Sequence, residues 1–232
     1  SSAASDVYKR QCDDCSSDDT LAILYQYQQT APFPVRIIRN AINIGPAETF
    51  FKAAMLAKSE YIAFCDQDDI WSDCKIDNCE RSIMRNKPDL ILHSYSNFEV
   101  NQRGNIVVTL NCSLPRLNVV KGGSLFPLTD WPGMSMVARK EMIMTSYPLR
   151  NGWIQYCLNK AGASAFGLYS NWCDYHDLHL LIAAREDRSI AFVHEVCALH
   201  RTGDGGLTSS QAAAQITSNH KRSRKALCLE IY

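Results

Sequence analysis

Short apolar runs alternate with amphipathic stretches along most of this chain. Runs rich in aromatic and β-branched residues predict buried strands at residues 35–38, 61–65, 90–93 and 106–108. Apolar residues at helical spacing predict helices between them, at about residues 17–28, 46–58 and 72–86. Because strands that alternate with helices favour a mainly parallel sheet with both faces covered, we expect an α/β fold.

Capping and turn residues set the limits of these elements. Ser17 is suited to cap the first helix, and Pro46 fits the first turn of the second. The third helix stops before Pro88. Residues 102–105 predict a turn between two extended segments. Residues 110–130 have few periodic signals and predict a long surface connection, which is often functional inside a compact domain.

The last part of the chain contains one further extended segment and two helical ones. Residues 133–138 are apolar and extended in pattern, and an amphipathic run follows at 178–183. The tail from 210 to 232 predicts a helix with a basic patch at 220–225. Such a patch is usually a solvated helix face, and attraction to anionic lipid is the alternative.

The composition is that of a single globular domain. The 232 residues include 24 Lys+Arg and 24 Asp+Glu, so the formal net charge is zero and no polybasic footprint for nucleic acid is present. No apolar run approaches the roughly 20 residues that a membrane-spanning helix needs. The first residues lack the apolar core of a secretory signal, so we expect a cytoplasmic protein whose 10 cysteines stay reduced.

An acidic cluster follows one of the predicted strands and is the most informative motif. Asp66, Asp68 and Asp69 come directly after the run 61–65, in the sequence DQDDIW (residues 66–71). Open α/β sheets bind ligands at the carboxyl ends of their strands. Asp66 and Asp68 can both turn toward one divalent cation, and Mg²⁺ or Mn²⁺ suits carboxylates together with substrate phosphates. The alternative is a solvated acidic loop.

Four further motifs accompany the acidic cluster in order. DDCSSDDT (residues 13–20) and NIGP (43–46) lie upstream, and GMSM (133–136) and YHD (175–177) lie downstream. The series resembles glycosyltransferase family 2, whose members show a DDxSxDxT turn, an NxG helix entry, a DxD strand end, a glycine-led acceptor strand and an ED or HD pair. The resemblance runs from about residue 13 to about residue 208. DQDDIW is most similar to the bacterial rhamnosyltransferase-like branch.

The resemblance implies a fold and a reaction. The family has the GT-A nucleotide-diphospho-sugar transferase fold and moves a sugar from a nucleotide-diphosphate donor with inversion at the anomeric carbon. The acceptor would be a glycan or a lipid-linked molecule in bacterial surface-polysaccharide synthesis. The enzyme would then work on the inner face of the cell membrane, with peripheral membrane association. Rhamnose as the transferred sugar is favoured only by the form of DQDDIW.

The same resemblance assigns residues to each part of the site. The nucleotide side would include Asp13, Asp14, Asn43 and Gly45. The divalent metal, Mn²⁺ or Mg²⁺, and the diphosphate would be held by Asp66, Asp68, His200 and Arg201. The acceptor side would be formed by Trp71, Gly133 and Met134. Gly133 would let a sugar approach the backbone closely, and a plain core strand is the alternative for Met134.

Residues 200–206 (HRTGDGG) resemble the flexible loop that closes over the diphosphate in this family. Arg201 can pair with phosphate oxygens, and His200 can donate to phosphate or ligate the metal. The glycines would permit the loop to open and close. Because the segment departs from the commoner YRxHG form, the assignment between His200 and Arg201 stays open.

Asp177 is the candidate base. Inverting transfer needs a carboxylate that takes the proton from the acceptor hydroxyl as it attacks the anomeric carbon. Asp177 precedes the amphipathic run at 178–183, so it lies near a helix N-terminus, which stabilises an ionised carboxylate. Asp174 is the competing carboxylate and can instead cap this helix. The match to the HD pair favours Asp177.

The cysteines offer a competing interpretation as a metal or redox site. Cys12 and Cys15 form a CxxC motif. The next pair, Cys74 and Cys79, has four intervening residues and does not form a second zinc knuckle. Cys15 also occupies the place where the family usually has glycine. We therefore interpret the CxxC motif as a coincidence.

The residues before Cys12 carry no buried-strand pattern and look foreign to the family. Members normally have an apolar strand and a helix ahead of the DDxSxDxT turn. We therefore expect a non-family segment at 1–11, a GT-A domain at 12–208 that lacks its first strand and helix, and a helical tail at 209–232. One alternative is a truncated, catalytically silent domain that binds nucleotide. Another is a metal-dependent nucleotidylyltransferase, which would be expected to carry a glycine-rich phosphate loop near its start.

Overall fold

The computed structural model describes residues 8–114, 119–121, 131–146, 176–184, 188–202 and 226–231. In chain order the described elements are β1 (Tyr8–Asp13), α1 (Thr20–Thr30), β2 (Val35–Arg39), α2 (Pro46–Met55), β3 (Tyr61–Cys65), β4 (Ile70–Trp71), α3 (Lys75–Asn86), β5 (Leu90–Val100), β6 (Ile106–Cys112), β7 (Val119–Lys121), the 3-10 turn η3 (Gly133–Ser135), β8 (Met136–Arg139), α4 (Lys140–Ser146), α7 (His176–Ala184), β9 (Ser189–Arg201) and β10 (Ala226–Ile231).

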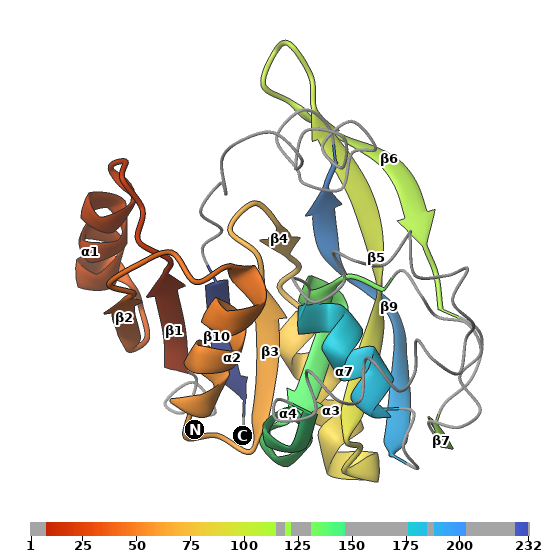
Figure 1. Ribbon diagram of the computed structural model, residues 1–232. Helices are drawn as coiled ribbons and strands as arrows, with labels where there is room; N and C mark the ends of the chain where they lie inside the picture. Colours follow the sequence, from red (N-terminus) through yellow and green to blue (C-terminus); the bar gives the residue numbers. More distant parts are fainter. Residues whose placement is uncertain are drawn as a thin grey trace, which may run out of the picture.

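A single sheet runs through the centre of the molecule (Figure 1). Its strand order is β2-β1-β10-β3-β8-β5-β9-β4, with β6 paired to β5 and β7 paired to β9. β10 and β8 are antiparallel to both of their neighbours, whereas β1 pairs parallel with β2 and β5 pairs parallel with β9. It follows that β2, β1, β3, β5 and β9 all run in one direction. The predicted α/β fold is confirmed, and the carboxyl ends of these five strands meet at one edge.

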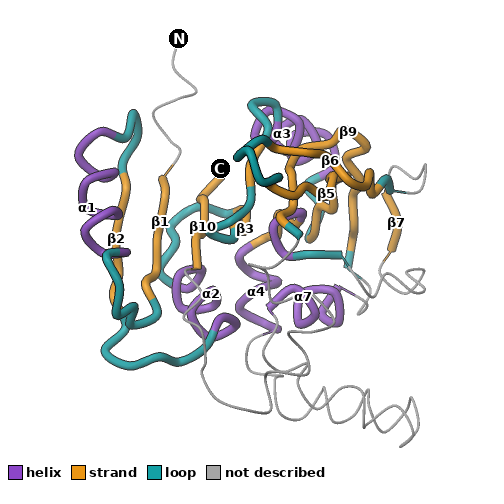
Figure 2. The backbone as a smooth tube through the Cα atoms, turned by 90° about the horizontal axis from the view of Figure 1, so that it is seen from above, coloured by secondary structure: helices purple, strands orange, loops and turns teal. Residues whose placement is uncertain are grey.

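Helices cover both faces of the sheet (Figure 2). α2, α4 and α7 lie on one face, and α3 lies on the other. β3 shows why its sequence is apolar at every position: Ile62 and Phe64 pack in the core on the α2 side, while Tyr61 and Ala63 pack in the core on the α3 side. All five residues of β3 are buried. The continuous apolar run thus marks a central strand covered on both faces.

Local hydrogen bonds decide where several elements begin. α1 begins at Thr20, and Asp18 Oδ1 accepts the backbone N–H of Thr20 at 3.1 Å, so the predicted cap at Ser17 is wrong. The predicted turn at 102–105 is confirmed, with Gly104 in the left-handed region at φ +79°. Pro46 opens α2, as predicted.

The predicted connection at 110–130 contains more strand than expected. β6 extends to Cys112, and β7 pairs with β9. Residues 115–118 and 122–130 lie outside the described residues. The extended segment predicted at 133–138 begins with the turn η3 and becomes a strand only at Met136.

Strands are found at both ends of the described chain. Residues 8–11, whose sequence carries no buried-strand pattern, belong to β1, which pairs with β2 and β10. Residues 226–231, expected in a helical tail, form β10, in which Leu227, Leu229 and Ile231 alternate with the period of a strand. β10 occupies the place between β1 and β3. The basic patch at 220–225 lies outside the described residues.

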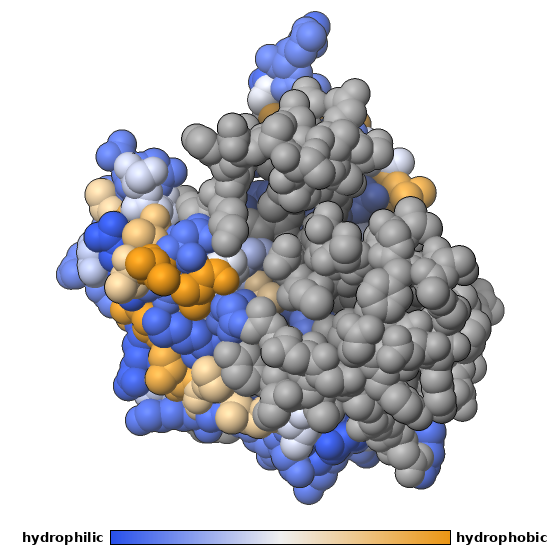
Figure 3. All heavy atoms as spheres, in the orientation of Figure 1, coloured by the Kyte–Doolittle hydropathy of each residue, from blue (hydrophilic) through white to orange (hydrophobic). Residues whose placement is uncertain are grey.

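On the face that Figure 3 shows, the described part is mainly hydrophilic, with a smaller group of apolar atoms at β6 and a larger one over α2 and the loop before it. Ile42, Met55 and Leu56 are the exposed large hydrophobic residues of this region. Among the described helices, none has both the length and the apolar composition to cross a membrane.

The central position of β10 predicts a strong effect of proline there. Leu229→Pro removes a backbone donor from a strand with neighbours on both sides. A buried ladder acceptor left unpaired costs about 1–3 kcal/mol, and for a chain of this size each kcal/mol lowers the Tm in thermal denaturation by roughly 2–4 °C. Val107→Pro on β6, which has one described neighbour, should cost less and serves as the control. Equal Tm values for Leu229→Pro and the unaltered chain would contradict the placement of β10.

Candidate active site

The acidic turn DQDDIW lies at the edge where the carboxyl ends of the five parallel strands meet (Figure 1). It follows β3, which sits in the middle of the sheet between β10 and β8. Asp66 and Asp68 are half-buried, and Gln67 is exposed. The structure thus places both predicted carboxylates where open α/β sheets bind ligands.

Asp69, to which the sequence analysis gave no role, has the most defined contacts of the cluster. Its side chain has no exposed surface. Oδ1 accepts from Nδ1 of His200 at 3.0 Å and from the backbone N–H of Arg201 at 3.2 Å. A buried carboxylate is costly unless donors compensate it, and these two donors come from the end of β9, 131 residues along the chain. Asp69 therefore fastens the acidic turn to the end of β9.

His200 and Arg201 are the last residues of β9. The prediction that placed them in a flexible loop is therefore wrong for these two residues, because strand pairing extends to Arg201 opposite Phe98 of β5. Burial disfavours the charged form of His200, but the hydrogen bond and charge of Asp69, with Asp66 and Asp68, raise the pKa of His200 above its usual value. Residues 203–206 lie outside the described residues.

The residues at this edge fit a divalent metal that arrives with a diphosphate. Within the described ranges no three His, Cys, Asp or Glu side chains cluster to hold a metal ion. Mg²⁺ does not require such a cluster, since it usually takes one or two carboxylates and completes its shell with phosphate and water oxygens. Asp66 and Asp68 offer hard oxygen ligands at a half-buried edge, which suits Mn²⁺ or Mg²⁺.

On the nucleotide side, Asp14 shapes the loop that leads into α2. Its carboxylate is fully buried and accepts from Nδ2 of Asn40 and from the backbone N–H groups of Ile44 and Gly45, each at 2.8 Å. Asn43 donates to the backbone carbonyl of Asp14 at 3.2 Å. Gly45 has φ +89°, a conformation that favours glycine. The structure therefore brings three predicted nucleotide-side residues, Asp14, Asn43 and Gly45, into one hydrogen-bonded loop.

Asp13 is also buried and fixes the turn after β1. Its carboxylate accepts from the backbone N–H of Ser16 at 3.1 Å and from the Ser16 hydroxyl, and Arg39 Nε lies 3.7 Å from it. Both Asp13 and Asp14 use their carboxylates on groups of the protein. Contact of either with a nucleotide stays a prediction.

The backbone conformation of Cys15 accounts for the glycine that the family usually has at this position of the turn after β1. Its φ is +60°, in the left-handed region that side chains disfavour. Cys12 is buried, which raises the pKa of its thiol to about 11, and the cysteines among the described residues are free thiols. A thiol with so high a pKa is poorly reactive. This arrangement supports the interpretation of the CxxC motif as a coincidence.

The acceptor-side residues meet around η3. Met134 is fully buried, so its side chain belongs to the core, packed with Tyr95 and Ala198. The backbone carbonyl of Met134 accepts from Nζ of Lys75 at 2.6 Å, and the same Nζ lies 3.6 Å from the centre of the Trp71 ring. The structure thus brings Trp71 and Met134 together through a lysine that the sequence analysis missed.

The structure gives a steric reason for glycine at position 133, beside the predicted approach of a sugar, which stays a prediction. A Cβ at this position would lie 2.1 Å from Nε2 of His176 and 2.7 Å from its Cε1, so the imidazole occupies the space in front of Gly133. His176 also stacks on Phe50, with ring centres 3.8 Å apart, and lies 5.1 Å from the ring of Phe64. The glycine of one motif and the histidine of the HD pair are therefore packed against each other.

Asp177 is half-buried in the first turn of α7, directly after His176. This position matches the predicted helix N-terminus, where the helix dipole favours a carboxylate. α7 packs against α2 and α4 on one face of the sheet (Figure 2). Because His176 is held by Phe50 and Gly133, the position of its neighbour Asp177 is held as well. The competing Asp174 lies outside the described residues.

Two signals in the sequence could have identified the missed residues. Lys75 is spaced at i, i+4 and i+8 with Cys79 and Ile83, so it lies on the buried stripe of α3. Asp69 directly follows Asp68, and two adjacent carboxylates seldom face the same way in extended chain. Neither pattern predicts which residue Lys75 or Asp69 contacts.

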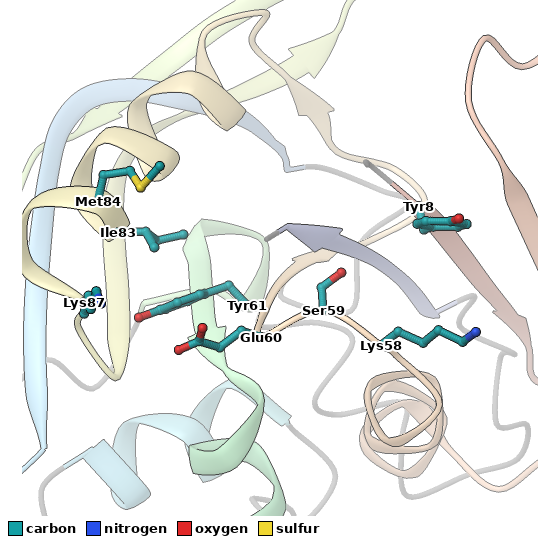
Figure 4. A pocket seen from close by; sticks show the side chains of 8 residues that line it. All are labelled: Tyr8, Lys58, Ser59, Glu60, Tyr61, Ile83, Met84 and Lys87. Atoms are coloured by element: carbon teal, nitrogen blue, oxygen red, sulfur yellow. The ribbon is translucent and has the colours of Figure 1, made fainter. Parts of the chain in front are cut away.

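A separate cavity of about 470 Å³ lies at the opposite end of β3 (Figure 4). Tyr8 lines it on one side and Ile83, Met84 and Lys87 on the other. Tyr61, the first residue of β3, donates its hydroxyl to the backbone carbonyl of Pro88 at 2.8 Å. The cavity is therefore not part of the edge that carries the acidic turn.

Comparisons with known proteins agree with this geometry. A family model described as glycosyl transferase family 2 matches residues 12–134. The UDP-Glc:alpha-D-GlcNAc-diphosphoundecaprenol beta-1,3-glucosyltransferase WfaP of Escherichia coli is 32% identical over 121 residues, which are 50% of this chain and 45% of that protein. The dTDP-rhamnosyl transferase RfbG of Shigella flexneri is 31% identical over 99 residues, 41% of this chain and 34% of that protein. The chain thus spans less than half the length of these relatives.

The solved structure of S. aureus TarS 1-349 in complex with UDP-GlcNAc has the same fold. It superposes with a TM-score of 0.59 and 17% identity, over 86% of this chain and 50% of that one. This likeness shows the GT-A fold. Since the family model covers more than half of the 232 residues, with the DQDDIW turn and Gly133 inside the match, the chain belongs to glycosyltransferase family 2.

Proposed function

We propose that this chain transfers a sugar from a nucleotide-diphosphate donor to a glycan or lipid-linked acceptor, with inversion at the anomeric carbon. The observation that carries the proposal is the edge formed by Asp66, Asp68 and His200, fastened by the buried Asp69. The relatives support it by their names, since WfaP uses UDP-Glc and a diphosphoundecaprenol-linked sugar, and RfbG is a dTDP-rhamnosyl transferase. Rhamnose and a role in surface-polysaccharide synthesis are parts of the proposal.

At the donor side, Asp66 and Asp68 would hold the metal together with the diphosphate of the donor. Bound Mn²⁺ or Mg²⁺ would supply Lewis-acid stabilisation of the charge on the departing diphosphate. His200 stands beside these carboxylates, and its Nδ1 is oriented by Asp69. Its Nε2 is therefore the ring nitrogen available to donate to a phosphate oxygen when the imidazole is protonated. Arg201 provides a second cationic side chain at the exposed end of β9.

At the acceptor side, Asp177 would take the proton from the attacking hydroxyl. The hydroxyl oxygen forms a bond to the anomeric carbon as the bond to the diphosphate oxygen breaks, and the proton moves to the Asp177 carboxylate. One displacement of this kind inverts the anomeric carbon. Its place in the first turn of α7 favours the ionised form of a carboxylate, which is the form that a base requires. Work on a lipid-linked acceptor would bring the protein to the inner face of the membrane.

The metal assignment predicts that donor binding depends on a divalent ion. We expect titration of the chain with UDP, dTDP and GDP to show tighter binding of one nucleotide with Mn²⁺ than with EDTA. Asp68→Asn should weaken that binding chiefly when metal is present, since it removes a charged oxygen ligand. Asp73→Asn, at an exposed position beyond the acidic turn, is the control. Equal affinities with Mn²⁺ and with EDTA in the unaltered chain would refute the assignment.

The base assignment predicts a loss of transfer without a loss of donor binding. Asp177→Asn preserves shape and removes the proton acceptor, so the transfer rate should fall by about 10² to 10⁴-fold while nucleotide affinity persists. Transfer can be measured from UDP-glucose or dTDP-rhamnose to a short-chain GlcNAc-diphosphate lipid. If Asp177→Asn transfers normally while Asp174→Asn does not, Asp174 is the base. Nucleotide binding without transfer in the unaltered chain would instead indicate a silent binding domain.

A further inference from the structure

A buried lysine contacts the residues of the proposed acceptor side, and both its burial and its place at a helix N-terminus disfavour its charge. Lys75 is the first residue of α3 and has no exposed surface. Burial lowers its pKa to about 8, and a cation at a helix N-terminus opposes the helix dipole. No ion pair joins Lys75 to another described residue. A lysine with these surroundings does not favour the folded state through its charge, so another reason must account for it.

The thiols around Lys75 provide no compensating charge. Cys65, Cys79 and Cys197 surround it, and burial raises their thiol pKa values to about 12, about 12 and about 11. All three are therefore neutral thiols near pH 7. The charge of Asp69 favours the ammonium without forming an ion pair with it, and the groups in contact with Nζ are a backbone carbonyl and an aromatic face.

Both partners of the ammonium belong to the acceptor side. Nζ donates to the backbone carbonyl of Met134 at 2.6 Å and lies 3.6 Å from the centre of the Trp71 ring. An ammonium donates a stronger hydrogen bond than a neutral group does, and a buried cation over an indole face adds a further attraction. Lys75 thus ties η3 to the segment that leaves the acidic turn.

The tie extends to the candidate base. Met134 follows Gly133, and the imidazole of His176 fills the space in which a Cβ on Gly133 would lie. A shift of η3 would therefore displace His176 and, with it, the neighbouring Asp177. Donor-side residues are fastened separately, through Asp69 and the end of β9.

We propose that Lys75 is a positioning residue of the acceptor side: its ammonium holds η3 against Trp71 and so sets where His176 and Asp177 stand. The inference rests on the proposed function for its effect on transfer. The hold on η3 itself can be measured without any activity.

The test is Lys75→Met, which keeps an unbranched side chain of similar length and removes the charge. Replacing a buried charge by an apolar side chain is often neutral or stabilising, so Tm should stay the same or rise. The amides of Ser135 and Met136, which donate to the carbonyls of Pro132 and Gly133, should exchange with deuterium at least about tenfold faster, the scale of one lost charged hydrogen bond. UDP affinity with Mn²⁺ should stay within about twofold, while kcat/KM for the GlcNAc-diphosphate lipid falls at least about tenfold.

Lys58→Met is the matched control, since Lys58 is an exposed lysine after α2, and it should change none of these quantities. Unchanged amide exchange in Lys75→Met would overturn the inference, as would a loss of UDP affinity as large as the loss of transfer. If the unaltered chain transfers no sugar to the probe, the proposed function fails with that probe, and amide exchange still decides the role of Lys75.

Trp71→Leu provides a second route to the same contact should Lys75→Met fold poorly. It removes the aromatic face and leaves the lysine in place, so exchange at Ser135 and Met136 should again become faster. Because both changes break one unit, the double variant should exchange no faster than the more affected single variant. Lys75 would be a core residue without a positioning role if the two changes had fully additive effects on amide exchange. The same would follow if neither single variant unfolded cooperatively.

Discussion

The candidate active site depends on one buried carboxylate at the edge of the sheet. The side chain of Asp69 has no exposed surface, and its Oδ1 accepts from the side chain of His200 and from the backbone of Arg201. The other carboxylate oxygen is buried without a hydrogen-bond partner among the described residues. Burial of this kind is tolerated only where the surrounding structure holds the donors in place. The pairing of β4 with β9 supplies that support, with Trp71 opposite Ala198.

Two sets of contacts extend from Asp69, one toward the proposed donor side and one toward the proposed acceptor side. On the donor side, the contact with β9 leaves Asp66 and Asp68 beside His200. On the acceptor side, the chain continues through Trp71 to Lys75 and the turn η3. Each set links elements that are distant in sequence, so both proposed sides of the site are positioned by the same edge of the sheet.

The sequence predicted what local pattern and short motifs determine. The apolar run at 61–65, the entry of α2 at Pro46 and the order of the family motifs all followed from neighbouring residues. The partner of Asp69 lies 131 residues away, and the partner of Lys75 lies 59 residues away, so no window on the sequence contains either pair. The prediction of a helical tail was wrong for the same reason, since residues 226–231 become a strand only through their neighbours β1 and β3.

Titration of UDP into Asp69→Asn with Mn²⁺ present tests the central claim most directly. An asparagine keeps the shape but loses the charge that holds His200 and the end of β9, so affinity should fall by at least about tenfold, the effect of weakening a buried charged hydrogen bond. Asp73→Asn, an exposed neighbour, should bind as the unaltered chain does. If Asp69→Asn stays folded and binds UDP with unchanged affinity, the buried carboxylate does not organise the site.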